Sequence, residues 1–241
     1  MTIQFNLEKS KETLQFVLEK HNVTTINPSQ VHLAFDVSGS FDYEHSNGYT
    51  QQLLNRIVPF SMLFDKNQTL DSYVFSDGAE VLDDINISNY ADYVRNKIQR
   101  SRIYNQGTQY LPIFKLLVEK STEDKKKVGF FGKMFGKQTE VKTESLQDKH
   151  IVFFVTDGDA YDQNQAKQFL DQAIKSNPNL FFVFISIGNQ PFQFFNNNYK
   201  DTSYSNYFNL TPSQLCNLKD AKDEDLFEMI INPSLEAWMN T

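Results

Sequence analysis

An aspartate and two serines follow a buried apolar run near the start of the sequence. Asp36, Ser38 and Ser40 lie in the stretch FDVSGS, directly after the residues VHLA. Alternate residues of an extended chain project to the same side, so we expect these three side chains to extend from one loop. A second aspartate, Asp157, follows another apolar run, IVFFV. The chemistry that these side chains offer is the binding of a cation by oxygen.

The ligand set that these residues form is made of hard oxygen atoms. It combines two carboxylates with hydroxyls and has no cysteine and no clustered histidines beside it, which suits Mg²⁺, Mn²⁺ or Ca²⁺ better than zinc or copper. Asp and Ser are also common in turns and at helix N-caps, so each residue has a plain structural interpretation. Their places at the ends of two apolar runs favour a metal site. Asp42, Asp77 and Asp159 lie near it in sequence, and we interpret them as solvated turn carboxylates.

The elements that must position these residues alternate along the chain. Apolar runs predict strands, and apolar residues at spacings of three and four predict helices. The predicted strands are 31–35, 70–75, 151–155, 180–187 and a short 207–210. The predicted helices are 7–20, 49–64, 88–100 with Ser88 as N-cap, 112–120, 164–175 and 223–239, the last broken at Asn232-Pro233. This alternation implies a doubly wound, mostly parallel α/β sheet of Rossmann type with helices on both faces. Ligands bind such sheets beyond the carboxyl ends of the strands, so Asp36 and Asp157 should meet there.

Composition limits the classes of function. The chain has 241 residues, of which 40% are hydrophobic, as in a folded globular protein. Its net charge of −7 argues against electrostatic binding of nucleic acid by the whole protein. Cys216 is the single cysteine and has no partner for an internal disulfide. The N-terminus does not follow the plan of a signal peptide and no apolar run approaches membrane-spanning length, so we expect a cytoplasmic protein.

Three separated elements of the sequence resemble the metal-ion-dependent adhesion site of von Willebrand factor A (vWA) domains. The run from Asp36 through Ser38 to Ser40 is similar to the D-x-S-x-S signature of that family. Thr108, in a Gly-Thr pair, is similar to the threonine of its second element, and Asp157 to the aspartate of its T-D-G turn. Order and spacing agree with the family over most of the chain. The resemblance implies a Rossmann-like vWA fold.

The resemblance also implies a role for each of these residues. Ser38, Ser40 and Thr108 would be hydroxyl ligands of Mg²⁺, with Mn²⁺ or Ca²⁺ as alternatives. Asp36 and Asp157 would bind the cation partly through water and orient the hydroxyls. Hydroxyls donate little charge, so the cation would stay electrophilic and accept a carboxylate from a partner protein.

Other stretches are similar to the vWA proteins of tellurium-resistance (Ter) clusters. They include Phe64-Asp65, the run YADYV from Tyr90, and the run GTQYLP from Gly107. The resemblance implies a non-enzymatic, metal-dependent interaction module in a bacterial or phage-borne tellurium-resistance or stress-response system. We expect residues 1–28 to form an amphipathic helix and linker, and residues 29–241 the vWA domain.

The segment 121–149 interrupts the regular alternation of elements. From Lys125 to Lys137 it carries five lysines and no acid, with three phenylalanines and a methionine between them. The favoured interpretation is a disordered loop that its lysines keep soluble. The alternative is a weak contact with a membrane interface or with a groove of a partner protein.

An enzyme with a metal in the same crevice is the alternative function. A Mg²⁺-dependent phosphohydrolase or phosphotransferase would use Asp36 and Asp157, but Ser38 stands where D-x-D phosphatases carry their acid/base. The sequence has no G-x-x-x-x-G-K-[ST], G-x-G-x-x-G or G-x-S-x-G motif. Its four histidines are scattered along the chain, and the one nearest the site, His45, is expected to face solvent. We therefore predict that the protein is not an enzyme.

Overall fold

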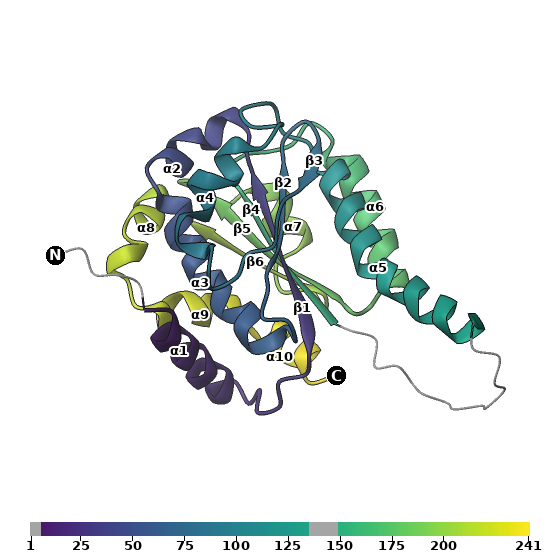
Figure 1. The fold of residues 1–241 in the computed structure, drawn as a ribbon. Coiled ribbons are helices and arrows are strands. Elements are labelled where there is room, and N and C mark those ends of the chain that lie inside the picture. The colour runs from purple at the N-terminus through teal and green to yellow at the C-terminus, as the bar shows by residue number, and fades with distance from the viewer. Residues whose placement is uncertain (1–5, 135–148) are drawn as a thin grey trace.

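A central sheet of six strands organises the computed structural model, which describes residues 6–134 and 149–241, with the backbone alone for 123–134. The order of the strands is β3-β2-β1-β4-β5-β6, and all neighbours are parallel except β3, which is antiparallel to β2 (Figure 1). The strands are β1 (Ser29–Asp36), β2 (Asp71–Phe75), β3 (Ala79–Val81), β4 (Lys149–Thr156), β5 (Leu180–Ile187) and β6 (Ser205–Leu210). The predicted doubly wound, mostly parallel α/β fold is confirmed. The edge strand β3 was not predicted.

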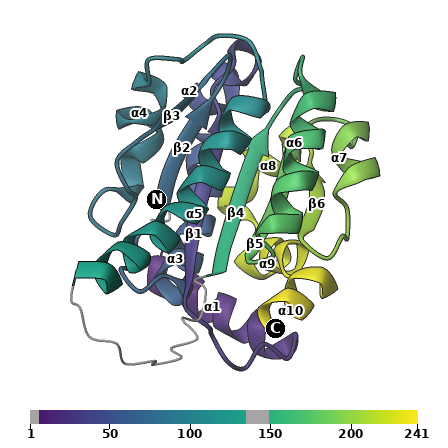
Figure 2. The same cartoon turned by 90° about the vertical axis from the view of Figure 1, so that its right-hand side faces the viewer.

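Helices cover both faces of the sheet. One face lies under α1 (Leu7–Lys20), α3 (Tyr49–Phe64), α8 (Pro212–Cys216), α9 (Asp223–Ile230) and α10 (Pro233–Met239), and the other under α5 (Leu111–Met134), α6 (Gln163–Ser176) and α7 (Gln193–Asn198). Two further short helices are α2 (Asp42–Ser46) and α4 (Tyr93–Asn96). Figure 2 shows α5 and α6 side by side in front of the sheet. The core is therefore divided into two apolar layers, one on each side of the strands.

The side chains of β1 and β4 alternate between these two layers. Leu33 and Phe153 enter the layer under α3, whereas Ala34 and Phe154 enter the layer under α5. Phe35 pairs with Val155, so the next residues along the two strands, Asp36 and Thr156, also lie beside one another. The order of the strands reverses at this pair, because β2 continues on one side of β1 and β5 on the other side of β4. This is the place where doubly wound sheets bind ligands.

The predicted helix over 88–100 is wrong. The structure has α4 in the middle of this stretch, with one turn of 3₁₀ helix on each side. Ser88 does not cap a helix: the first 3₁₀ turn begins at Tyr90, and the backbone N–H and hydroxyl of Ser88 both donate to the side chain of Asn86, at 2.9 and 2.6 Å. Such local bonds between side chain and backbone compete with helix formation. The helix is interrupted again at Lys97, whose φ is −126°.

The helix α5 is longer than the predicted helix over 112–120, because it runs from Leu111 to Met134. The predicted disordered loop is therefore wrong for residues 121–134. This stretch has no proline after Pro112 and is rich in lysine, a good helix former. Residues 135–148, which include the end of the segment Lys125–Lys137, lie outside the described residues.

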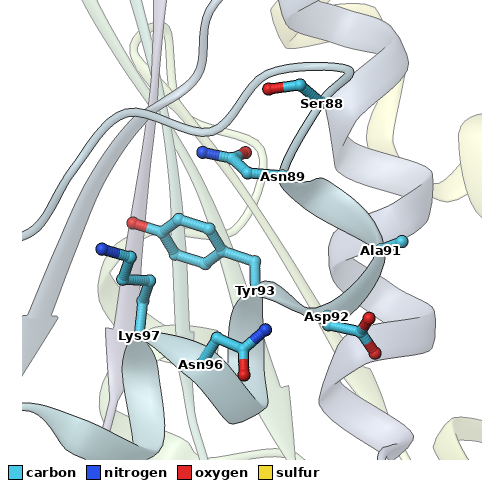
Figure 3. A pocket seen from close by; sticks show the side chains of 7 residues that line it. All are labelled: Ser88, Asn89, Ala91, Asp92, Tyr93, Asn96 and Lys97. Atoms are coloured by element: carbon cyan, nitrogen blue, oxygen red, sulfur yellow. The ribbon is translucent and has the colours of Figure 1, made fainter.

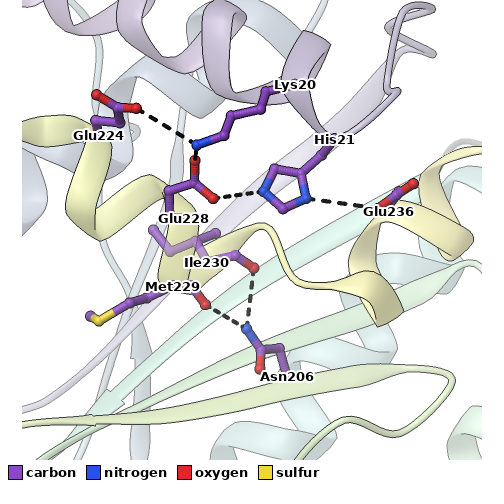
Figure 4. Close-up of polar contacts among 8 residues, drawn as sticks. All are labelled: Lys20, His21, Asn206, Glu224, Glu228, Met229, Ile230 and Glu236. Atoms are coloured by element: carbon purple, nitrogen blue, oxygen red, sulfur yellow. Dashed lines mark hydrogen bonds and ion pairs between the residues drawn. The ribbon is translucent and has the colours of Figure 1, made fainter.

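The predicted N-terminal helix over 7–20 is confirmed as α1, which packs against α3 and α9. Polar contacts join its C-terminal end to α9, as Figure 4 shows. Lys20 forms an ion pair with Glu228, and His21 Nε2 lies 2.8 Å from Glu228 Oε2. His21 Nδ1 also lies 3.7 Å from a carboxylate oxygen of Glu236. The side chain of Asn206 in β6 donates to the last carbonyls of α9.

The division of the chain at residue 28 stays a prediction. None of the described helices has the length and apolar character to cross a membrane.

Candidate metal site at the carboxyl edge of the sheet

Asp36 is the last residue of β1, and its side chain is fully buried. Its Oδ1 accepts a hydrogen bond of 2.8 Å from the backbone N–H of Ser38. Its Oδ2 accepts a bond of 2.6 Å from the hydroxyl of Thr156, the neighbouring residue on β4. The carboxylate is thus held rigidly at the point where the strand order reverses.

The two serines lie next to this carboxylate. The chain stays extended at Ser38 and then enters a turn of 3₁₀ helix over Gly39–Phe41, so Ser40 is not on an extended chain as predicted. The turn nevertheless keeps the serine hydroxyls together, with Ser38 Oγ 3.1 Å from Ser40 Oγ. The Ser40 hydroxyl donates in turn to Asp157 Oδ1 at 3.0 Å. Four of the five predicted ligands therefore form one continuous cluster.

Thr108 is brought to this cluster by backbone contacts of its loop. The N–H of Gly39 donates to the carbonyl of Gln106 at 3.0 Å, and the N–H of Tyr161 donates to the carbonyl of Thr108 at 3.2 Å. Thr108 itself is 7% exposed. A Cβ at Gly107 would lie 2.3 Å from Asp77 Oδ1, so glycine allows the loop to pass this close. The threonine thus sits between the loop after β1 and the loop after β4.

The electrostatics of the cluster disfavour two bare negative charges. Burial raises the pKa of Asp36 to about 6, although the hydrogen bonds from Thr156 and Ser38 act in the opposite direction. Burial also raises the pKa of Asp157 to about 7, and the negative charge of Asp36 contributes to that increase. The two carboxylates would ionise more readily with a cation between them.

The composition of the surrounding loops leaves this charge uncompensated. Residues 36–48, 76–78, 104–110 and 156–162 contain seven acidic residues and neither lysine nor arginine. Within the described part of the chain, the two carboxylates accept hydrogen bonds from hydroxyl and backbone groups. The donor set of carboxylates and hydroxyls therefore fits a hard divalent cation. It does not depend on a dense acidic cluster: the described residues hold no group of three or more His, Cys, Asp or Glu side chains arranged for a metal.

His45 was predicted to face solvent, and this prediction is wrong. The side chain is 2% exposed, on α2 one helical turn beyond the buried Phe41. Its Nε2–H donates to the backbone carbonyl of Asp36 at 2.8 Å, so Nδ1 accepts from the hydroxyl of Thr50, also at 2.8 Å. Burial lowers the pKa of His45 to about 4, which keeps the ring neutral. The spacing of four residues from Phe41 was the signal that His45 lies on an inward face.

The three acidic residues near the cluster are exposed, as predicted. Asp42 Oδ1 accepts from the hydroxyl of Tyr104 at 2.8 Å, and Asp159 Oδ1 accepts from the side chain of Gln163 at 2.8 Å. Asp77 lies over Gly107. These residues add negative charge to the rim of the site.

The histidines are not all scattered. His32 in β1 and His150 in β4 meet at the opposite end of the sheet, where His32 Nε2 lies 3.0 Å from His150 Nδ1. His32 Nδ1 lies 3.1 Å from Asp71 Oδ2, and both histidines are buried. Burial alone would raise the pKa of Asp71, but the hydrogen bond and the charge of His32 hold it below its ordinary value. In this cluster the carboxylate has a histidine partner, and His32 lies four residues before Asp36 on β1.

A separate surface pocket of about 260 Å³ lies around α4 and the turn before it. Figure 3 shows its lining side chains, which include Asn89, Tyr93 and Lys97. Tyr93 donates to the carbonyl of Asp83, and Lys97 pairs with the carboxylate of the same residue. Tyr93 and Lys97 are therefore already bonded within the protein, and we assign no ligand to this pocket.

Comparison with known proteins shows the family to which this chain belongs. The family described as "vWA found in TerF C terminus" matches residues 28–241, and the chain belongs to this vWA-TerF-like family. The uncharacterized protein YcbR of Bacillus subtilis (strain 168) is 24% identical over 192 residues, which cover 79% of this chain and 69% of YcbR.

Among solved structures, the chain is similar to proximal thread matrix protein 1 (PTMP1) of the mussel byssus. One crystal form has a TM-score of 0.52 and 17% identity and covers 85% of this chain. A second structure of PTMP1 is described as having a zinc-occupied MIDAS motif, where MIDAS stands for metal-ion-dependent adhesion site. It has a TM-score of 0.50 and 18% identity and covers 80% of this chain. The chain spans about half the length of these proteins, 47% and 46%. At this identity the likeness shows a shared fold.

Proposed function

We propose that this protein is a non-enzymatic interaction module that binds a divalent cation at the carboxyl edge of its sheet and, through it, a carboxylate of a partner protein. The observation that carries the proposal is the pair Asp36 and Asp157, which are linked through the two serines. The Ser38 N–H donates to Asp36, and the Ser40 hydroxyl, beside that of Ser38, donates to Asp157. The loops around them contain no lysine or arginine. With Thr108, these residues would hold the cation. Membership of a vWA family supports the same reading.

The cation that we propose is Mg²⁺, with Mn²⁺ or Ca²⁺ as alternatives. Oxygen ligands from carboxylates and hydroxyls favour these hard cations over zinc. The zinc-occupied MIDAS motif of PTMP1 supports divalent binding at a site of this kind, but not a choice between metals. Titrating the three cations separately would rank them.

The contacts of the site favour binding over catalysis. His45 is the nearest imidazole, and both of its nitrogens are engaged by Asp36 and Thr50. It is therefore not free to move a proton to or from a substrate. The alternative, a metal-dependent phosphohydrolase or phosphotransferase, predicts turnover of phosphate esters or nucleotides with Mg²⁺ or Mn²⁺. Turnover that disappears in Asp36→Ala would establish that alternative.

The rim of the site indicates what surrounds the partner's carboxylate. Two exposed tyrosines follow the ligand loops, Tyr43 at 62% and Tyr161 at 86% exposure. The exposed carboxylates of Asp42 and Asp159 stand in the same loops. An acidic segment would be repelled by this rim, so we propose that the partner's carboxylate lies between lysines or arginines, which can also stack on the tyrosines.

The setting that we propose is the cytoplasm, in a bacterial or phage-borne stress-response or tellurium-resistance system. The description of the matching family by its occurrence in TerF supports this setting. A second, weaker contact with a membrane or partner groove would involve Lys125–Lys137. Co-sedimentation with anionic vesicles, with and without that segment, tests the membrane contact; equal pelleting of both proteins would exclude it.

The experiment that tests the metal site is calorimetric titration of Mg²⁺ into the wild type, Asp36→Ala and Asp71→Asn. We expect the wild type and Asp71→Asn to bind and Asp36→Ala not to bind. Asp71→Asn is the matched control, because it removes a carboxylate from the opposite end of the same sheet. Equal binding by the wild type and Asp36→Ala, or binding by neither, would overturn the proposal.

A further inference from the structure

The loop that carries Thr108 depends on a residue that is not part of the ligand set. Asp162 follows β4 and immediately precedes α6. Its Oδ1 accepts from the backbone N–H of Tyr110 at 2.8 Å, and its Oδ2 accepts from the backbone N–H of Leu111, also at 2.8 Å. Both oxygens of one carboxylate thus bind the start of α5, 51 residues away in the sequence.

This contact replaces a cap that the local sequence does not supply. The first N–H groups of a helix have no partner within the helix, and a Ser, Thr, Asp or Asn just before it usually binds one of them. The residue in that place is Tyr110, whose hydroxyl instead donates to the carbonyl of Gly158. A carboxylate is a favourable partner at this position, because the helix dipole is positive at the N-terminus.

The consequence is a fixed distance between two of the predicted metal ligands. Thr108 lies two residues before Tyr110, and Asp157 lies five residues before Asp162. The N–H of Tyr161 adds a bond to the carbonyl of Thr108, so the loops are joined at several points. In the described structure the Thr108 side chain has no hydrogen bond of its own to the cluster. Its position therefore depends on the hydrogen bonds that join its loop to the loop after β4.

We propose that Asp162 is the positioning residue of the metal site, and that it acts by fixing the start of α5 and thereby the Thr108 hydroxyl relative to Asp157. The proposal rests on the proposed metal function and deepens it. Asp162 touches neither the cation nor the partner. Without its carboxylate, the Thr108 loop would move away from the β4 loop, and water would replace the threonine hydroxyl as a ligand.

A double-mutant cycle with Mn²⁺ as the probe tests this proposal. Calorimetric titrations compare the wild type, Asp162→Asn, Thr108→Val and the double variant. We expect about a tenfold loss of Mn²⁺ affinity in Asp162→Asn, and no further loss when it is added to Thr108→Val, because both act through one hydroxyl. Water-proton relaxation should report one more Mn²⁺-bound water in both single variants than in the wild type.

The matched control is Asp159→Asn, which removes the same charge from the same loop without touching the Thr108 loop. We expect its Mn²⁺ affinity to stay within about threefold of the wild type, since exposed charges are screened. Asp162→Ser, with a side chain common at helix N-termini, is the second variant if Asp162→Asn melts below the titration temperature. It should fold and still lose affinity, because one hydroxyl cannot bind both N–H groups.

The outcomes separate this proposal from the metal function itself. A wild type that does not bind Mn²⁺ would remove the proposed function. Three outcomes would leave the metal site intact and overturn the role of Asp162. They are an Mn²⁺ affinity of Asp162→Asn equal to that of the wild type, an equal loss of affinity in Asp159→Asn, or losses in Asp162→Asn and Thr108→Val that add in the double variant.

Discussion

The two ends of the central sheet carry buried polar side chains on the same two strands, and they differ in how charge is balanced. At the amino end, His32 of β1 and His150 of β4 stand together, and the carboxylate of Asp71 pairs with His32. At the carboxyl end, Asp36 and Thr156 stand together on the same strands, and Asp36 accepts hydrogen bonds from two neutral donors, the Ser38 N–H and the Thr156 hydroxyl.

This difference shows in the direction of the pKa shifts. Asp71 has a pKa below its ordinary value, because His32 compensates for its burial. Asp36 and Asp157 have raised pKa values, with burial as the main cause. One fold thus compensates the buried carboxylate at one end with a histidine, and at the other end leaves the two carboxylates that we propose bind a cation.

The largest expected effect on metal binding comes from a change at the carboxyl end. In Asp36→Asn, the amide can still accept from the N–H of Ser38 and can donate to Thr156, so the fold should persist. We expect at least a hundredfold loss of Mn²⁺ affinity, or about 2.7 kcal/mol. In EDTA at pH 7.5 the variant should melt at a higher temperature than the wild type, because a buried charge is gone. An unchanged affinity by calorimetry would contradict the assigned role of Asp36.

The next effect concerns the support beneath the metal site. His45→Ala leaves a cavity and an unpaired carbonyl at Asp36, so we expect a loss of about 3 kcal/mol in the free energy of unfolding. Urea denaturation measures it. His21→Ala is the control, because the His21 side chain is partly exposed beside Glu228, and it should cost less than about 1 kcal/mol. Equal losses in both variants would show that His45 is not a special support.

The amino end should respond to the same chemical change with the opposite sign. Asp71→Asn removes the charged partner of His32, so we expect the variant to lose about 2 kcal/mol of stability. Thermal melting in EDTA, beside Asp36→Asn, is the direct comparison. If both variants were stabilised, the contrast between the two ends would be wrong.

The smallest effect is a dependence of stability on pH. The pKa of Asp157 is about 7 in the folded protein, above the ordinary value for an aspartate, so the folded state binds more protons than the unfolded state between about pH 4 and 7. Lowering the pH from 8 to 6.5 should therefore stabilise the metal-free protein, by about 1 kcal/mol. The lowered pKa of Asp71 acts only below about pH 4, where stability is lost as that carboxylate gains a proton.

Thermal melts in EDTA across that pH window measure this slope. Asp157→Asn is the control, and its melting temperature should not change over the same pH window. Saturating Mg²⁺ should remove or reverse the slope in the wild type, because the cation binds the ionised carboxylates. A wild type whose stability falls from pH 8 to 6.5 would show that Asp157 is ionised throughout.

Much of the fold and the site could be predicted from local patterns. The apolar runs before Asp36 and Asp157 identified two strands and the edge at which they end. The helix over 7–20 was clear from its spacing. The helix over 88–100 could not be predicted correctly, because its apolar spacing does not show the 3₁₀ turns on both sides of α4 or the break at Lys97.

What the sequence by itself determined is the chemistry: an aspartate at the end of one strand and directly after another, serines at the turn that follows the first, and loops without a basic residue. These depend on residue type and short spacing, which the chain carries directly. What the tertiary structure decided is which distant groups complete or support that chemistry. The pairing of His32 with His150 spans 118 residues, and the capping of α5 by Asp162 spans 51. Such contacts depend on the register and order of the strands, which bring residues together only when the whole sheet has formed.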